Sequence, residues 1–450
     1  MKNRKNRLCV ALFALLLAAS LLAMSSCGIL LETDEEEYLT KSEVEELLNG
    51  RLDGNVTVEG GDNYDITINN TGNQNVTTAS KAMLSAVAVR SYFKKNYASG
   101  FGPNASISTR EYALSGSGVI YKLDKENGDA YIITNYHVVY DSSSNTANKI
   151  SGDIDVFLYG MENTDLKIDA TYIGGSAAFD IAVLKVEDSR LLVESNAVAA
   201  VVADSNLVTA LDTAIAIGAP DALGLDASNV TDIHLLPVDN ISATLGYVSV
   251  DSEYITTSYL DLYSSIDMRL IRIDTAVNSG NSGGGLFNDR GELIGIVNAK
   301  MADTSIDNIS YAIPSNIAKY VTDNIIYNCD GKEGENLLKP IIGITVASSD
   351  PRTVLDEESG RIYKEETVSV SKITAGSVAE ALFEVGDVLN SVTIDGVKYE
   401  ITRQFHLIDC MLNARVGSEV IISVTRVVDG EETKLDKTVE ITEDILVKYP

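Results

Sequence analysis

The fold of this chain is decided by one stretch of sequence, Asp274-Thr275-Ala276-Val277-Asn278-Ser279-Gly280-Asn281-Ser282-Gly283-Gly284-Gly285-Leu286. Four glycines lie within three residues of Ser282, and apolar stretches lie before this segment (270–273) and after it (293–297). Glycine adopts positive φ and lets the backbone approach closely, so this turn can direct several N–H groups to one point beside the Ser282 hydroxyl. An acyl-transfer enzyme needs that geometry, because its oxyanion develops next to the nucleophile. Taken alone, the stretch is better explained as a glycine-rich hairpin turn, so the choice depends on a base and an acid elsewhere.

His137 is the candidate base. The chain has three histidines, and this one follows the apolar stretch 131–134. A neutral imidazole at the end of a strand can accept the Ser282 proton and return it to a leaving amine. A purely structural histidine is the alternative. His234 lies in a polar stretch and His406 in a later helical stretch, and neither has a comparable setting.

Asp180 is the candidate acid, because it directly precedes the apolar stretch Ile181-Ala182-Val183-Leu184. A carboxylate buried at the start of such a strand is costly without a partner. If it accepted the Nδ1–H of His137, it would fix the imidazole tautomer and stabilise the imidazolium. As a solitary residue, Asp180 is better explained as a turn or capping residue. The three candidates together favour catalysis.

The rest of this region reads as short strands. Apolar, β-branched stretches alternate with turn residues between Lys81 and Ile317, with clear examples at 118–121, 131–134, 154–158, 181–186 and 213–217. Many short strands with frequent turns favour antiparallel barrels over βαβ units. Helical periodicity returns only at 315–326. We therefore expect a mainly β fold, and we expect the polar stretches 251–267 and 302–308 to be mobile loops.

Three motifs resemble the signatures of the HtrA family of trypsin-like serine proteases, in the order His, Asp, Ser. They are Thr134-Asn135-Tyr136-His137-Val138-Val139, Asp180-Ile181-Ala182-Val183-Leu184-Lys185 and Gly280-Asn281-Ser282-Gly283-Gly284. Weaker matches occur at 216–220, 291–296 and 309–316, so the likeness covers about 85–326. It implies two six-stranded β-barrels with the catalytic groups in the cleft between them.

The resemblance also assigns roles. Ser282 is the implied nucleophile, His137 the general base and acid, and Asp180 the orienting carboxylate. The N–H groups of Gly280 and Ser282 form the implied oxyanion hole, in which the Gly280 peptide flips in a resting state of regulated members. Ser279 and Gly285 depart from the residues common in the family, a departure that we expect to loosen the loop without removing a catalytic group.

Specificity follows from the same resemblance. The residue six positions before the nucleophile forms the pocket floor in trypsin-like folds, and here it is Ala276. Alanine has no carboxylate that could bind a Lys or Arg side chain of the substrate. Val277 and Met301 are candidate apolar lining, so we expect cleavage after small or aliphatic residues.

A second organisation begins near Leu338. The residues Ile341-Ile342-Gly343-Ile344-Thr345-Val346 resemble the carboxylate-binding loop and following strand of a PDZ domain, a small α+β module. The stretch 375–381 resembles its middle helix, 402–412 the groove helix and 420–427 a late strand. We expect an extended C-terminal peptide to pair with the strand while Ile342, Gly343 and Ile344 hold its carboxylate. A generic small α+β domain is the alternative.

The N-terminus carries an export signal. Four basic residues precede the apolar run 8–24, which is too short for a confident membrane span. Small residues then lead directly to Cys27, an arrangement that resembles a bacterial lipoprotein signal in which Cys27 is lipidated. Ordinary secretion with an idle Cys27 is the alternative. We therefore expect a chain in the bacterial cell envelope, tethered to the outer face of the cytoplasmic membrane or in the periplasm.

The net charge of −30 disfavours nucleic acid as a partner. Cys329 and Cys410 make no disulfide framework, so we expect both to be free and buried. No His/Cys cluster has metal-ligand spacing, so no metal or other cofactor is expected. The predicted domains are a signal peptide (1–26), a polar stalk with a short helix (27–80), a protease domain (81–328), a linker (329–339) and a PDZ domain (340–445). Alternation at 64–68 within the stalk also fits a small sheet or an oligomer contact.

These observations predict a membrane-tethered serine endoprotease that degrades misfolded or unfolded polypeptides, with its PDZ domain assisting binding or regulation. Homo-oligomers such as trimers are common among related proteases, but the stalk offers no familiar contact. The alternative is a catalytically silent peptide-binding or chaperone protein on the same fold. An esterase is disfavoured, because the serine lacks a Gly-x-Ser-x-Gly elbow and the order is not Ser, Asp, His.

Overall fold

The computed structural model describes residues 55–59, 65–69, 80–99, 106–162, 166–221, 233–235, 238–257, 266–299, 309–329, 337–357 and 359–449. The predicted signal peptide, Cys27, Met301 and most of the predicted linker lie outside these residues. Two compact units result, Met1–Gly72 and Asn73–Pro450. In the part of the chain that is described, no helix is long and apolar enough to cross a bilayer.

The first unit contains one antiparallel pair of strands, β1 (Asn55–Glu59) and β2 (Asp65–Asn69). The register pairs Val56 with Ile68 and Val58 with Ile66. The alternation at 64–68 therefore belongs to a small sheet, which is one of the two structures left open by the sequence.

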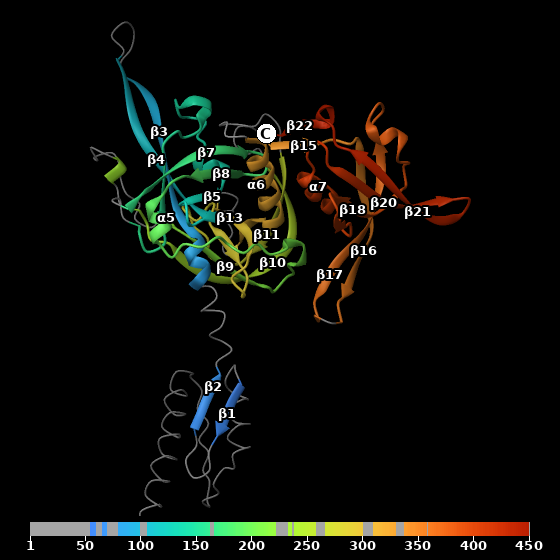
Figure 1. Cartoon of the computed structure of the whole chain (residues 1–450), viewed down its shortest axis with the longest axis horizontal. Coiled ribbons are helices and arrows are strands. Elements are labelled where there is room, and N and C mark those ends of the chain that lie inside the picture. Colours follow the sequence, from blue (N-terminus) through green and yellow to red (C-terminus); the bar gives the residue numbers. More distant parts are fainter. Residues whose placement is uncertain are drawn as a thin grey trace, which may run out of the picture. The chain divides into compact units, whose positions relative to one another are not determined.

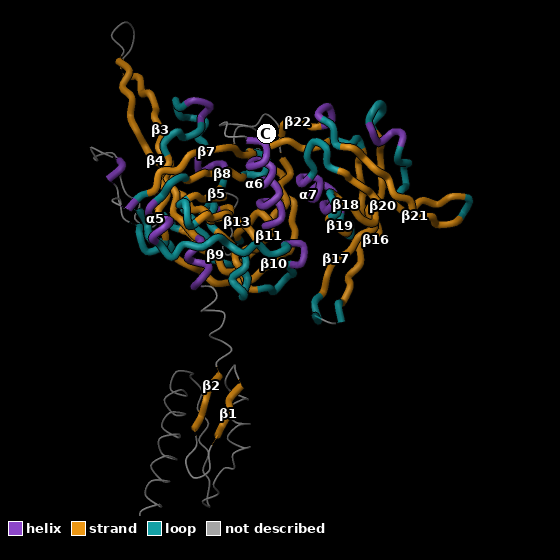
Figure 2. The backbone as a smooth tube through the Cα atoms, viewed as in Figure 1, coloured by secondary structure: helices purple, strands orange, loops and turns teal. Residues whose placement is uncertain are grey.

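The second unit begins with a closed six-stranded antiparallel barrel, which we call barrel 1 (Figures 1 and 2). Its strands are β3 (Ala86–Ser99), β4 (Ser106–Asp124), β5 (Asp129–Thr134), β6 (Ile154–Leu158), β7 (Ile168–Ser176) and β8 (Ile181–Val186). β3 pairs with β4 along the whole length of β3, and the two strands continue past the barrel as a long hairpin arm (Figure 1). Alternate side chains fill the barrel with aliphatic groups, among them Val87, Ile120, Ile132 and Leu184.

A second closed barrel, barrel 2, follows. Its strands are β9 (Thr213–Gly218), β10 (Ser242–Thr257), β11 (Ile266–Ile273), β12 (Gly285–Phe287), β13 (Leu293–Asn298) and β14 (Ser310–Pro314). The short helices α4 (Tyr136–Val139) and α5 (Arg190–Glu194) belong to barrel 1 and the connection after it, and α6 (Ser315–Cys329) follows barrel 2. Two closed six-stranded barrels confirm the mainly β, trypsin-like fold expected from the motifs.

One predicted loop is wrong in part. Residues 251–257 continue β10, and residues 253–257 pair with β11, from Glu253 opposite Leu270 to Thr257 opposite Ile266. The polar composition suggested a loop, but Asp251 is paired with Lys364 and Arg403 of the C-terminal region, at 2.7 and 3.1 Å. Ion pairing from a distant segment thus stabilises a strand that has little apolar character of its own.

The C-terminal module is a small α+β sheet domain. Strands β16 (Ile344–Leu355), β17 (Ile362–Ile373), β18 (Val388–Ile394), β20 (Glu419–Val428) and β21 (Glu431–Glu440) form its sheet, and β19 (Val397–Glu400) pairs with β18. The helix α7 is shorter than predicted, Gln404–Cys410, and the expected middle helix is one 3-10 turn, Val378–Ala381. β15 (Leu337–Pro340) pairs with the last strand, β22 (Leu446–Tyr449).

The module packs on α6. Asn324 of α6 is fully buried and donates to the carbonyls of Leu338 and Leu412, at 2.8 and 3.1 Å. Arg269 of β11 forms a buried ion pair with Asp409 of α7. Cys329 and Cys410 are free and buried, as predicted.

Candidate active site

His137 and Asp180 meet where α4 approaches the start of β8. His137 lies in the first turn of α4, and Asp180 directly precedes β8 with a φ of 50°. The Asp180 carboxylate is fully buried, and its Oδ2 lies 2.8 Å from His137 Nδ1. Its Oδ1 accepts the backbone N–H of His137 at 3.0 Å. Two contacts from one carboxylate orient the His137 imidazole and favour the tautomer that carries its proton on Nδ1.

Asn298 is a third polar group at this position, and the sequence did not reveal it. It ends β13 of barrel 2, is fully buried, and donates from Nδ2 to Asp180 Oδ2 at 2.9 Å. The backbone carbonyl of Asp180 is also held, by Asn135 Nδ2 at 2.9 Å and by the N–H of Tyr136 at 3.2 Å. Both barrels therefore position the carboxylate. The available signal was a polar residue that directly follows the apolar stretch 293–297.

Ser282 is held beside the strand that leads to His137. Gly283 has a φ of 86°, and a side-chain Cβ at this position would collide with Thr134 Oγ1 and with the Ser117 carbonyl. The same Cβ would lie 2.9 Å from the backbone N of Asn135. The residue after Ser282 thus packs against the chain two to three residues before His137. Only glycine permits this approach, which explains why the stretch is rich in glycine.

The loop that contains Ser282 has a donor for each of four successive carbonyl oxygens. The Ser279 carbonyl accepts the Asp221 N–H at 2.7 Å, and the Gly280 carbonyl accepts the Ser117 hydroxyl at 2.7 Å. The Asn281 carbonyl accepts the Gly284 N–H at 3.0 Å, and the Ser282 carbonyl accepts the Ser117 N–H at 2.8 Å. A trans peptide directs its N–H opposite to its C=O. In the described part of the chain, no acceptor takes the N–H of Gly280 or of Ser282. These two N–H groups are the pair named for the oxyanion hole.

The predicted specificity residues are only partly described. Ala276 is exposed, and its carbonyl accepts the Thr244 hydroxyl at 2.8 Å. Val277 is half-buried and packs on the core of barrel 2. Met301 lies outside the described residues, so the pocket that these three were expected to form stays a prediction.

The predicted carboxylate-binding loop leads into β16. Ile342 is buried, Gly343 has a φ of 96°, and Ile344 begins the strand. Two hydrogen bonds hold the carbonyls of this loop. Gly343 O accepts the N–H of Thr374 at 2.8 Å, and Ile342 O accepts the N–H of Ala379 at 3.1 Å. On the α7 side, Gln404 donates from Nε2 to the Val346 carbonyl at 3.2 Å.

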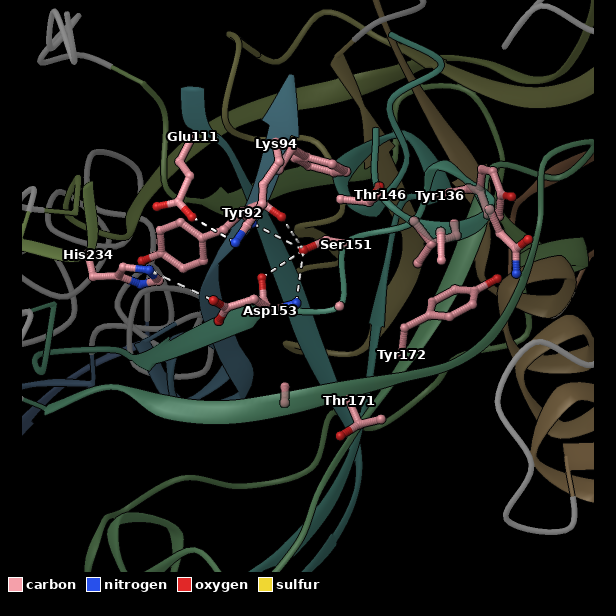
Figure 3. A pocket seen from close by; sticks show the side chains of 16 residues that line it. Tyr92, Lys94, Glu111, Tyr136, Thr146, Ser151, Asp153, Thr171, Tyr172 and His234 are labelled. Atoms are coloured by element: carbon pink, nitrogen blue, oxygen red, sulfur yellow. Dashed lines mark hydrogen bonds and ion pairs between the residues drawn. The ribbon is translucent and has the colours of Figure 1, made fainter. Parts of the chain in front are cut away.

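A cavity of about 660 Å³ lies on barrel 1 (Figure 3). Its wall includes the aromatic side chains of Tyr92, Tyr136 and Tyr172, with Asp153 and His234 on the opposite side from Tyr136. Tyr136 precedes His137 in the chain, but no member of the His–Asp–Ser set lines the cavity.

Comparisons with known proteins agree with this geometry. Residues 116–296 match the model of the trypsin-like peptidase domain. The chain is 31% identical over 382 residues to a serine protease Do-like HtrA of Lactococcus lactis, covering 77% of this chain and 84% of that protein. A serine protease Do-like HtrA of Bacillus subtilis is 30% identical, with 76% and 68% covered.

The periplasmic serine endoprotease DegP of Escherichia coli is also 30% identical, over 65% of this chain and 51% of that protein. Identity at this level over most of two relatives, together with the two barrels, establishes the family. This chain belongs to the HtrA family of trypsin-like serine proteases and is a serine endopeptidase.

Proposed function

We propose that Ser282, His137 and Asp180 are the catalytic residues of this protease. The observation that carries the proposal is the buried Asp180 carboxylate, which binds both the Nδ1 and the backbone N–H of His137. In this mechanism Ser282 Oγ attacks the scissile carbonyl carbon while His137 Nε2 takes its proton. The carbonyl oxygen becomes an oxyanion and binds the N–H groups of Gly280 and Ser282. His137 then protonates the leaving amine, and water hydrolyses the acyl-enzyme.

The substrates are misfolded or unfolded polypeptides, cleaved after small or aliphatic residues. Ala276 supports this choice, since it offers no carboxylate to a basic P1 side chain. Digestion of reduced, unfolded casein and of the same mass of a stable folded protein tests it. We expect casein peptides that end in Ala, Val, Ile or Leu, and no cleavage of either protein by Ser282→Ala. Cleavage chiefly after Lys or Arg would contradict the proposed pocket, and intact casein would favour a silent peptide-binding protein.

The C-terminal module is a PDZ domain that binds C-terminal peptides of substrates through Ile342, Gly343 and Ile344. Supporting this, Gly343 has a positive φ and the loop carbonyls are already bonded, so the backbone is ordered before a ligand arrives. Peptide binding there stimulates proteolysis. Casein hydrolysis measured with and without a saturating peptide that ends in an aliphatic residue tests the coupling, and equal rates would remove it.

The protein acts in the bacterial cell envelope, tethered through lipid on Cys27. The basic and apolar residues before Cys27 support export, and a relative from E. coli is named as periplasmic. Metabolic labelling with radioactive palmitate should mark the full-length chain but not a Cys27→Ala variant. Equal labelling of both chains, or of neither, would contradict the anchor.

A further inference from the structure

Ser117 of β4, in barrel 1, forms hydrogen bonds with residues 279–284, which contain Ser282 and which we call the nucleophile loop. It is fully buried between Gly116 and Gly118. Its N–H donates to the Ser282 carbonyl at 2.8 Å, and its hydroxyl donates to the Gly280 carbonyl at 2.7 Å. The same hydroxyl accepts the N–H of Ala219, from the chain that follows β9, at 2.8 Å. One serine therefore joins barrel 1 to two segments of barrel 2.

These bonds hold two peptide units, the one between Gly280 and Asn281 and the one between Ser282 and Gly283. The Gly280 carbonyl belongs to the peptide that follows the Gly280 N–H, and the Ser282 carbonyl to the peptide that follows the Ser282 N–H. Because each peptide is planar, the Gly280 N–H lies in one plane with the Ser279 carbonyl, which accepts the N–H of Asp221. In the same way, the Ser282 N–H lies in one plane with the Asn281 carbonyl, which accepts the N–H of Gly284. Ser117 holds the next peptide in each case, so both peptides that meet at Gly280, and both that meet at Ser282, are held by hydrogen bonds. Gly280 has a φ of 91°, and since glycine has the widest range of backbone angles, the Ser117 bond restricts a residue that is intrinsically free to rotate.

Three glycines pack closely against Ser117. A Cβ at Gly218 would lie 2.8 Å from Ser117 Oγ, and one at Gly284 would lie 3.2 Å from Ser117 Cβ. A Cβ at Gly283 would collide with the Ser117 carbonyl. Three glycines on two segments thus leave room for this one side chain and its backbone. The glycine-rich sequence serves the approach of Ser117 as well as the turn itself.

We propose that Ser117 is a positioning residue for the oxyanion hole, acting through the Gly280 and Ser282 carbonyls rather than by touching substrate. The proposal rests on the catalytic roles proposed above for Gly280 and Ser282. On this proposal, the Ser117 hydroxyl strengthens the binding of the transition state and does not affect the binding of the substrate in its ground state. Its loss should therefore lower kcat and leave KM unchanged.

A peptide aldehyde ending in alanine is the probe. Ser282 Oγ adds to the aldehyde carbon, the C=O π pair moves to oxygen to form a hemiacetal oxyanion, and the serine proton passes to His137. The inhibition constant then reports the oxyanion hole, and it does not depend on the fraction of molecules that fold. In Ser117→Ala we expect the inhibition constant to rise and kcat to fall by about tenfold, below the roughly 100- to 1000-fold cost of deleting a donor. KM for the matching peptide amide should stay within about twofold.

Ser151→Ala is the matched control. Ser151 is also buried in barrel 1, and its hydroxyl also donates to a backbone carbonyl and accepts a backbone N–H, both of Tyr92, at 2.8 and 3.1 Å (Figure 3). Within the described residues, the Ser151 hydroxyl bonds only to the backbone of Tyr92 and Asp153 and not to the loop that contains Ser282. We expect this variant to match the wild type in kcat and inhibition constant, even if its melting temperature falls.

An inhibition constant and kcat in Ser117→Ala equal to those of the wild type would overturn the proposal while leaving the protease function intact. If Ser117→Ala does not fold, Ser117→Cys carries the same test, because a thiol keeps the shape but is a weak donor. A wild type that neither cleaves peptide nor binds the aldehyde would instead overturn the catalytic roles, and the role of Ser117 with them.

Discussion

At the scale of the residue, the buried carboxylate of Asp180 is held by three hydrogen bonds. It has no solvent exposure, and it accepts hydrogen bonds from the His137 backbone, the His137 ring and Asn298. A buried carboxylate without such donors would be strongly destabilising. Asn298 differs from the other donors because, in the described part of the chain, its own Oδ1 has no hydrogen-bond partner. An unpaired buried oxygen costs stability, so we expect Asn298 to matter more for the orientation of Asp180 than for stability.

Asn298→Leu should separate stability from activity. We expect the free energy of unfolding to change little, because the variant removes an unpaired oxygen together with the hydrogen bond. We expect kcat to fall by about ten- to a hundredfold, since a hydrogen bond to a charged group contributes roughly 1.5–3 kcal/mol. Chemical denaturation and peptide hydrolysis measure the two quantities.

The control is Asn316→Leu. Asn316 is also buried and also donates to a carboxylate, Asp204 Oδ1 at 2.6 Å, but its Oδ1 accepts the N–H of Ser205. It should lose stability and keep its kcat. A reversal of the two patterns would show that Asn298 has only a structural role.

At the scale of the element, the motif residues were predictable and their supports were not. His137, Asp180 and Ser282 lie in three short motifs, and it is the combination and order of these motifs, not any one of them alone, that predicts catalysis. Ser117, Asp221 and Asn298 look ordinary in sequence and gain their roles only when strands of different barrels meet. The same limit explains residues 251–257, which have loop-like composition and are held as strand by Lys364 and Arg403. Long-range pairing of this kind leaves no local signal.

The loop before β16 provides a prediction for one element. A Cβ at Gly343 would collide with Ser377, and the φ of 96° adds strain. In Gly343→Ala we expect the affinity for a C-terminal peptide to weaken by more than about tenfold, with hydrolysis of a short peptide amide unchanged. Fluorescence anisotropy of a labelled peptide measures the affinity.

Gly396→Ala is the control in the same module. Gly396 also has a positive φ, 85°, but a Cβ there would meet no atom within 4 Å. This variant should bind peptide as the wild type does. If both variants bind peptide normally, the groove does not lie at 342–344.

At the scale of the whole molecule, the junction between barrel 2 and the C-terminal module contains a titratable group. His406 of α7 accepts the N–H of Thr402 on Nδ1 at 3.3 Å and is therefore neutral there. Burial lowers the pKa of His406 to about 4, and the guanidinium groups of Arg269 and Arg403 act in the same direction, opposed by Asp204. A depressed pKa means that the unfolded chain takes up a proton at a pH where the folded chain does not.

Acidification should therefore destabilise the junction between about pH 6.5 and pH 4, and no further below that. From pH 7 to pH 5 we expect the wild type to lose about 2 kcal/mol more stability than His406→Gln, which has no titrating ring. Urea denaturation of both proteins at each pH, followed by a probe on the C-terminal module, measures the difference. Parallel pH profiles would contradict this account of His406.

The most direct measurement of the central claim is labelling with a fluorophosphonate, which forms a covalent bond to an activated serine. The account predicts one adduct per folded chain, located on Ser282 by peptide mass spectrometry and absent from Ser282→Ala. Folded wild-type protein that takes up no label, or that carries the label on another serine, would contradict the catalytic assignment of His137, Asp180 and Ser282.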